Sequence, residues 1–120
     1  MAVAKTARVM GTERLGSDTL LLELCATGPV GFIGGQYLIL DSRIVLPNGK
    51  AVKRAYSFLT GDAEQRRFQL AVKRIPDGLG SAFVHGLDAG TDISFSGPWG
   101  KFVPREGASG RTLILATDTG

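Results

Sequence analysis

Arg54, Ala55, Tyr56 and Ser57 stand in a row, and their side chains could hold a flat ligand that carries a phosphate. An arginine offers a bidentate fork for a phosphate group. A tyrosine can lay its ring against an aromatic ligand, and a serine hydroxyl can donate to a ring heteroatom. In a strand, Arg54 and Tyr56 would share one face, with Ala55 and Ser57 on the other. A surface arginine, a core tyrosine and a solvated serine would give the same sequence, so both interpretations stay open here.

A second candidate is the glycine-rich stretch Asp77–Ser81, which opens the only convincing helix pattern, at 79–85. Gly78 and Gly80 would let a ligand approach the backbone closely. The N–H groups at a helix start favour an anion such as a pyrophosphate. A plain turn with Ser81 as a capping residue fits equally well. The stretch therefore predicts either a phosphate cradle or a simple helix start.

Two later stretches carry weaker signals. Gly97–Phe102 places two aromatic residues in a Gly/Pro loop, where they could line a ligand or close the end of a barrel. Thr117 and Gly120 lie in a loop of small residues after an apolar run, which is typical of the entry to a dinucleotide site but also of a C-terminal tail. The single histidine, His85, and the single cysteine, Cys25, have no ligand cluster beside them, so we predict no metal site.

These candidates must be positioned by short strands, because turn signals recur at close spacing. Glycine makes up 17 of the 120 residues, about twice its usual share. We expect six or seven strands and one helix, which form an all-β antiparallel barrel or sandwich. The strands are expected at 7–14, 19–24, 36–40, 44–46 joined through an Asn-Gly turn to 51–58, 67–73 and 91–96, and the helix at 79–85.

The last apolar run, 112–116, is continuous rather than alternating, which suits a strand buried on both faces of a parallel sheet. A parallel α/β domain could begin in this way. We therefore expect a barrel domain at 1–104, followed at 105–120 by a linker and the first strand of a nucleotide-binding domain. Because the chain stops there, we expect it to be part of a longer protein.

The charge pattern favours a mixed solvated surface. The net charge is +3, and 14 basic residues are interleaved with 11 acidic ones, whereas nucleic-acid binders gather Lys and Arg on one face. A basic patch for an anionic ligand or an acidic partner protein is the alternative. Residues 1–10 lack the apolar stretch of a signal peptide, and no run approaches about 18 apolar residues. We predict no membrane span and a cytoplasmic protein.

The order of these motifs resembles that of the ferredoxin–NADP reductase superfamily over about residues 5–120. Gly35-Gln36-Tyr37 is similar to that family's Pro-Gly-Gln-Tyr segment, with Gly34 in place of the proline. The other motifs follow in the family's order and spacing: Arg54-x-Tyr56-Ser57, Val72-Lys73, Gly78-x-Gly80-Ser81, Gly97-Pro98-x-Gly100-x-Phe102 and Leu115-Ala116-Thr117-x-Thr119-Gly120.

The resemblance implies a six-stranded antiparallel Greek-key barrel, capped by one helix, that binds FAD or less often FMN. Arg54 would bind the flavin phosphate, and Ala55 would lie beside it in the binding strand. Tyr56 would pack against the isoalloxazine, and Ser57 would bond near its N5 edge, where hydride arrives. These last two would be the catalytic residues.

The resemblance gives the remaining positions supporting roles. The backbone at Val72 and Lys73 would hold the ribityl or phosphate portion. The phosphate would also be bound by backbone amides of Gly78, Gly80 and Ser81. The nicotinamide loop would begin with Thr117 and Gly120. Asp118 stands where the family loop has its first glycine, and a carboxylate beside a pyrophosphate is electrostatically unfavourable.

The function that the resemblance implies is electron transfer from NAD(P)H, through FAD, to a protein acceptor such as ferredoxin, flavodoxin or an oxygenase component. The NAD(P)-binding domain would lie beyond this chain. The alternative is a non-catalytic β-barrel module that binds flavin or docks a protein. An oligonucleotide-binding barrel is disfavoured, because aromatic residues do not alternate with Lys and Arg along the strands.

Overall fold

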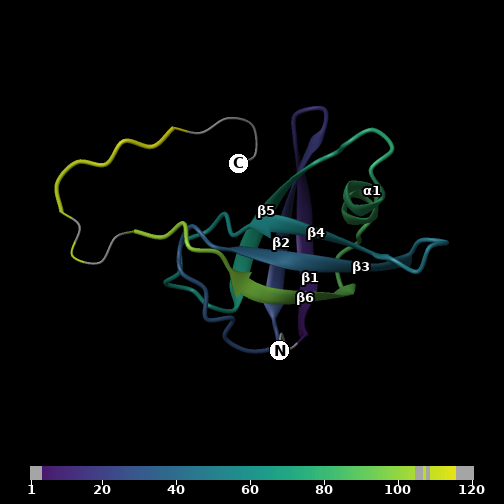
Figure 1. The fold of residues 1–120 in the computed structure, drawn as a ribbon, viewed down its shortest axis with the longest axis horizontal. Coiled ribbons are helices and arrows are strands. Elements are labelled where there is room, and N and C mark those ends of the chain that lie inside the picture. The colour runs from purple at the N-terminus through teal and green to yellow at the C-terminus, as the bar shows by residue number, and fades with distance from the viewer. Residues whose placement is uncertain (1–3, 105–106, 108, 116–120) are drawn as a thin grey trace.

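The computed structural model describes residues 4–104, 107 and 109–115. Its elements follow the chain in this order (Figure 1): β1 (Lys5–Leu15), β2 (Thr19–Ala26), β3 (Tyr37–Val45), β4 (Ala51–Ser57), β5 (Arg67–Lys73), α1 (Leu79–His85) and β6 (Asp92–Trp99). All strand pairings are antiparallel, in the order β4-β3-β6-β1-β2-β5. The predicted all-β architecture of six antiparallel strands and one short helix is confirmed.

The sheet curls into an open barrel whose two edge strands are β4 and β5. No hydrogen-bonded ladder joins these edges among the described residues. Just beyond β4, however, the Leu59 N–H donates to the Gln69 carbonyl at 2.9 Å, which holds the edges together at one end. The helix α1 packs against β3, β4 and β5. Both edges therefore diverge beside the helix, and backbone groups on an edge strand remain available to another partner.

Alternating side chains explain why the interior strands form. In β2, Leu20, Leu22 and Leu24 are buried, and in β5 Phe68 and Leu70 are buried in the same alternating way. The register places Leu22 opposite Leu70 and Leu24 opposite Phe68. Because successive residues of a strand point to opposite faces, this pattern fixes which face lines the core.

Four phenylalanines run through the core and fix the end of β4. The rings of Phe32 and Phe58 are stacked with centroids 4.1 Å apart, Phe58 meets Phe68 edge-on at 5.1 Å, and Phe68 meets Phe95 at 5.8 Å. Burial of one such side chain contributes about 1.5–3 kcal/mol. Since Phe58 directly follows β4, its burial anchors the strand that carries Arg54.

Four strands, β1, β2, β3 and β6, run further than predicted. β3 continues through 41–45, and β6 continues past residue 96 to include Gly97 and Pro98. The pairing of β6 with β3 shifts register between Tyr37 and Ile39, so the two strands pair again at Trp99. Such a bulge accommodates a proline within a strand, since the proline need not donate to the ladder.

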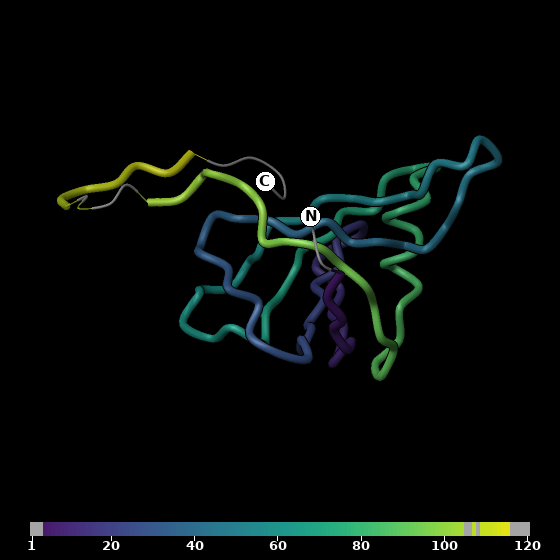
Figure 2. The backbone as a smooth tube through the Cα atoms, turned by 60° about the horizontal axis from the view of Figure 1, so that its bottom comes forward, coloured from purple at the N-terminus to yellow at the C-terminus, as the bar shows by residue number. Residues whose placement is uncertain are grey.

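The predicted strand at 112–116 does not form in its described part. Residues 112–115 have no regular secondary structure, and the segment lies apart from the barrel (Figures 1 and 2). Leu113, Ile114 and Leu115 are 84%, 77% and 87% exposed. A strand needs neighbouring strands for its backbone hydrogen bonds, and no described strand pairs with this one. Residue 116 lies outside the described residues.

The described helix is too short to cross a bilayer, because α1 has only seven residues. A membrane-spanning helix needs about 20.

Candidate functional site

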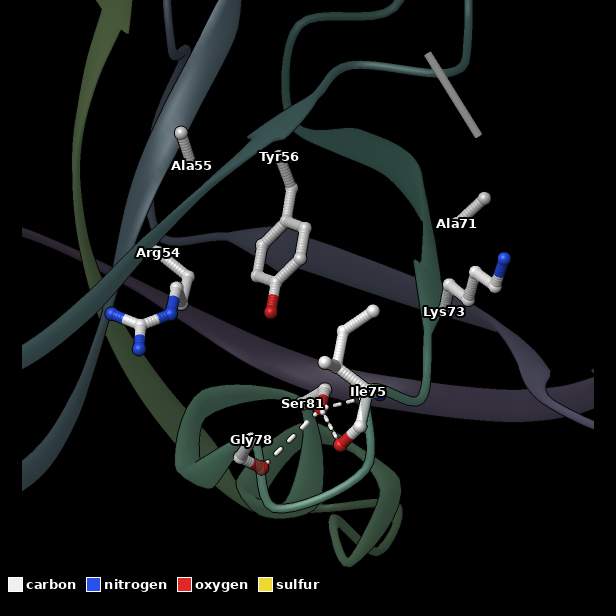
Figure 3. A pocket seen from close by; sticks show the side chains of 8 residues that line it. All are labelled: Arg54, Ala55, Tyr56, Ala71, Lys73, Ile75, Gly78 and Ser81. Atoms are coloured by element: carbon white, nitrogen blue, oxygen red, sulfur yellow. Dashed lines mark hydrogen bonds between the residues drawn. The ribbon is translucent and has the colours of Figure 1, made fainter. Parts of the chain in front are cut away.

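A cleft of about 310 Å³ opens where β4, β5 and the start of α1 meet (Figure 3). Three elements that follow one another along the chain supply its walls. The residues that line it are Arg54, Ala55 and Tyr56 from β4, Ala71 and Lys73 from β5, and Ile75, Gly78 and Ser81 from the turn and helix that follow. The volume falls at the lower end of the range of small-molecule sites.

The strand β4 aims Arg54 and Tyr56 in the same direction. In the register Arg54 lies opposite Leu40, and Tyr56 opposite Leu38. Both leucines are buried in the core, so the two β4 side chains point inward at the edge of the sheet. There the barrel is open, so the Arg54 side chain stays exposed while Tyr56 is half-buried against the core.

Arg54 and the helix start lie in direct contact. A Cβ atom added to Gly80 would stand 2.5 Å from Cγ of Arg54. The Arg54 guanidinium donates to the Lys53 carbonyl at 2.8 Å. A guanidinium carries five N–H donors, so this bond leaves several donors for an anion. The arginine and the Gly78–Ser81 stretch thus stand on the same side of the molecule, as a ligand that bridges them requires.

The hydroxyl of Ser81 holds the turn that precedes the helix. It accepts a hydrogen bond from the Ile75 N–H at 3.0 Å and donates toward the Gly78 carbonyl at 3.3 Å. The N-cap residue is Gly78, so Ser81 is not the cap that one interpretation of the sequence expected. The first intrahelical bond is donated by Ala82 to Gly78, and the amides before Ala82 have no partner within the helix.

The charge of the cleft is positive. Arg54 and Lys73 are among its eight lining residues, and none of the eight is acidic. Burial raises the pKa of the Tyr56 phenol above its ordinary value, while the charge of Arg54 acts in the opposite direction. Tyr56 therefore stays neutral at physiological pH, and its ring presents a flat surface in the cleft.

Some predicted residues lie elsewhere. Val72 is fully buried in the core, and its carbonyl contacts Nε2 of His85 at 2.9 Å, so it offers the cleft no side chain. Ser57 sits on the opposite face of β4 from Tyr56 and does not line the cleft. Thr117 and Gly120 lie outside the described residues.

Sequence reasoning missed Ala71 and Ile75 as lining residues. Ala71 alternates with the core residues of β5, so it could have been found as the small residue facing outward beside Lys73. Ile75 is an apolar residue that stays 52% exposed just after the strand. Its position before Pro76 marks a turn, but only the fold brings that turn against β4.

The aromatic residues of Gly97–Phe102 do not contribute to the cleft. Trp99 is 37% exposed, and its indole N–H donates to the Ser96 hydroxyl at 3.2 Å. Phe102 is 84% exposed, and its carbonyl lies so close to Gly35 that a side chain there would collide with it. Neither Trp99 nor Phe102 is among the residues that line the cleft, so whether this loop meets a ligand stays a prediction.

The sequence pattern of the family described as "Oxidoreductase FAD-binding domain" matches residues 6–103. The chain belongs to this family. It is 39% identical over 89 residues to a ferredoxin–NADP reductase B of Sorangium cellulosum, covering 74% of this chain and 35% of that protein. It is also 30% identical over 120 aligned residues to the reductase subunit of an aromatic O-demethylase from Amycolatopsis, covering 96% of this chain and 34% of that protein.

Solved structures agree with the assignment of this FAD-binding domain. A cytochrome P450 reductase from Amycolatopsis superposes with a TM-score of 0.73 at 30% identity, over 87% of this chain and 30% of that chain. The ferredoxin reductase of a carbazole 1,9a-dioxygenase, at 24% identity, shares the fold with a TM-score of 0.74, over 88% of this chain and 31% of that chain. The chain thus spans about a third of the length of the proteins that it matches.

The residues of the cleft fit the groups that FAD carries. Two cations with no acidic side chain among the lining residues suit a phosphate. The Gly78 backbone lines the cleft without a side chain, and the Tyr56 ring offers a surface for a planar ring system. No group of three His, Cys, Asp or Glu side chains gathers as metal ligands within the described part of the chain.

Proposed function

We propose that this domain holds FAD in the cleft between β4, β5 and α1. The observation that carries the proposal is the meeting of Arg54, Tyr56 and Gly78 around one positively charged hollow. The strands β4 and β5 stand at opposite ends of the sheet order, so the cleft exists only because the barrel is left open beside the helix.

The proposed roles follow from position. Arg54 binds the flavin phosphate through its guanidinium, with the first-turn amides of α1, around Gly80 and Ser81, on the other side of the same group. Tyr56 packs its ring against the isoalloxazine. The β5 edge at Lys73 supplies backbone groups to the ribityl chain, and Val72 contributes only as the buried anchor of that edge.

We further propose that the whole protein transfers electrons from NAD(P)H to a protein acceptor, such as ferredoxin, flavodoxin or an oxygenase component. FAD, when bound, supplies the redox chemistry by accepting a hydride and releasing electrons. Tyr56 orients its ring, whereas the Ser57 side chain, on the opposite face of β4, has no contact in the cleft through which to do so. The NAD(P)-binding part begins with the loop that holds Thr117 and Gly120 and continues in the rest of the protein, which we propose to be cytoplasmic.

A titration of the purified domain with FAD tests the first proposal. Binding is followed by quenching of flavin fluorescence and by calorimetry, with FMN and riboflavin in parallel. We expect saturable binding of FAD, weaker binding of riboflavin because it has no phosphate for Arg54, and a decline with added salt. A domain that binds neither FAD nor FMN would contradict the proposal.

A further inference from the structure

Gly80 occupies a position where glycine is unexpected. It is the second residue of α1 and is buried. Its backbone has no positive φ angle that would require glycine. Alanine is the better helix former at such a position. Neither backbone conformation nor helix formation therefore explains the glycine.

The neighbour that a side chain would meet is Arg54. A Cβ on Gly80 would stand 2.5 Å from Cγ of Arg54 and 3.5 Å from both Cδ and Nε. Real Cβ contacts are essentially never that close to Cγ. The aliphatic stem of Arg54 thus lies across the bare face of Gly80, and the contact sets where the stem leaves β4.

We infer that Gly80 is a positioning residue, which seats the stem of Arg54 so that its guanidinium points to the phosphate position in the cleft. This inference rests on the proposed flavin site and gives separate roles to the residues of the Gly78–Ser81 stretch. Gly80 acts on the ligand through Arg54, and the Ser81 hydroxyl holds the turn.

A double-mutant cycle tests this coupling. The dissociation constant for FAD is measured for the unmodified domain, G80A, R54A and the double variant. We expect G80A to weaken FAD binding about tenfold, because the displaced stem carries the guanidinium away from the phosphate. In the R54A background the colliding atoms are gone, so G80A should change the affinity little.

Thermal unfolding without flavin gives a second readout of the same contact. Alanine in a helix raises stability unless it collides with a neighbour. We therefore expect G80A to raise the midpoint of unfolding in the R54A background by more than it does in the unmodified domain. The control is G86A at the other end of α1, where an added Cβ meets atoms at 3.6 Å or more; its effects should be the same in both backgrounds.

The outcomes separate the two proposals. If G80A weakens FAD binding equally with and without Arg54, the glycine serves close approach of the ligand and the positioning role is wrong. Additive changes in unfolding midpoint would also overturn it. If R54A weakens FAD binding but G80A does not, the flavin site stands and the inference fails. If the unmodified domain binds no flavin, the proposed function fails and the positioning role fails with it.

Discussion

The cleft beside α1 and a second depression on the barrel are both partly basic, yet they differ in how their charges are used. The second depression, which we call the Arg8 depression, is lined by Arg8, Met10, Cys25, Ala26, Thr27, Arg66 and Asp92. At about 440 Å³ it is larger than the cleft. Volume alone would therefore favour the Arg8 depression over the cleft.

In the Arg8 depression one of the two arginines is paired with a carboxylate, and the other bonds a backbone carbonyl. Nε of Arg8 donates to the Asp92 carboxylate at 3.2 Å, and Nε of Arg66 donates to the Ala26 carbonyl at 3.3 Å. The lining of the cleft has Arg54 and Lys73 but no carboxylate. An anion therefore gains more in the cleft, since no acidic group in the lining repels it. The comparison teaches that the balance of charge, more than the size of the hollow, distinguishes the proposed binding site from the Arg8 depression.

The largest expected effect on flavin affinity comes from substituting an arginine of the cleft rather than one of the Arg8 depression. R54A should weaken flavin binding by about 1.5–3 kcal/mol, because it removes charge-assisted hydrogen bonds to the phosphate. R8A, the matched control, should change it by less than about 0.5 kcal/mol. The dissociation constants of both variants for FAD are measured by calorimetric titration. Equal losses of affinity would contradict the distinction between the cleft and the Arg8 depression.

The next effect concerns the ring that faces the cleft. Y56A should weaken FAD binding by about 1 kcal/mol, the order of one aromatic contact. Y56F keeps the ring and should retain most of the affinity. Because Tyr56 also packs against the core, circular dichroism must show that each variant is folded. Should Y56F lose as much as Y56A, the hydroxyl rather than the ring would carry the interaction.

The ion pair of the Arg8 depression should matter little to stability. Its side chains are 63% and 55% exposed, and pairs of this kind contribute about 0–1 kcal/mol. A double-mutant cycle with R8A and D92A, measured by urea unfolding at low and high salt, should give a small coupling that salt reduces. A large coupling that persists in salt would show that the depression is more rigid and less solvated than its exposure indicates.

The smallest effect is confined to alkaline pH. The pKa of Tyr56 is raised by burial, so the folded state keeps the phenolic proton after the unfolded chain, with its ordinary pKa of about 10, has begun to lose it. Stability should be full below that pH and fall as pH rises through the folded-state pKa. Y56F should show a shallower alkaline loss in unfolding experiments. Identical profiles for Y56F and the unmodified domain would contradict the assignment.

Much of the fold could be predicted from local patterns. The alternation of β2 and β5 follows from burial on one face, and Gly86 ends α1 as expected. The Asn-Gly turn between β3 and β4 also forms, with Gly49 at φ +85° and its N–H donating to the Leu46 carbonyl at 2.8 Å. These features depend on near neighbours in the sequence, and so the sequence suffices for them.

The apolar run at residues 112–115 shows where reasoning from local patterns fails. Leu20–Leu22 and Leu113–Leu115 are similar in composition, but the first lies within a central strand and the second is exposed. Apolar residues become a buried strand only where other strands satisfy the backbone and cover the side chains. Composition carries no information on whether those strands are present.

The sequence by itself determined which residue types could bind a phosphate and a flat ring, and in what order along the chain they occur. Tertiary structure alone decided that the arginine stem of β4 lies on Gly80, that Ala71 and Ile75 complete the cleft, and that the barrel stays open there. The physical reason is the distance along the chain over which each kind of interaction acts. Side-chain chemistry and turn preference are local properties, whereas a cleft forms where distant segments approach without closing, and this depends on the packing of the whole core.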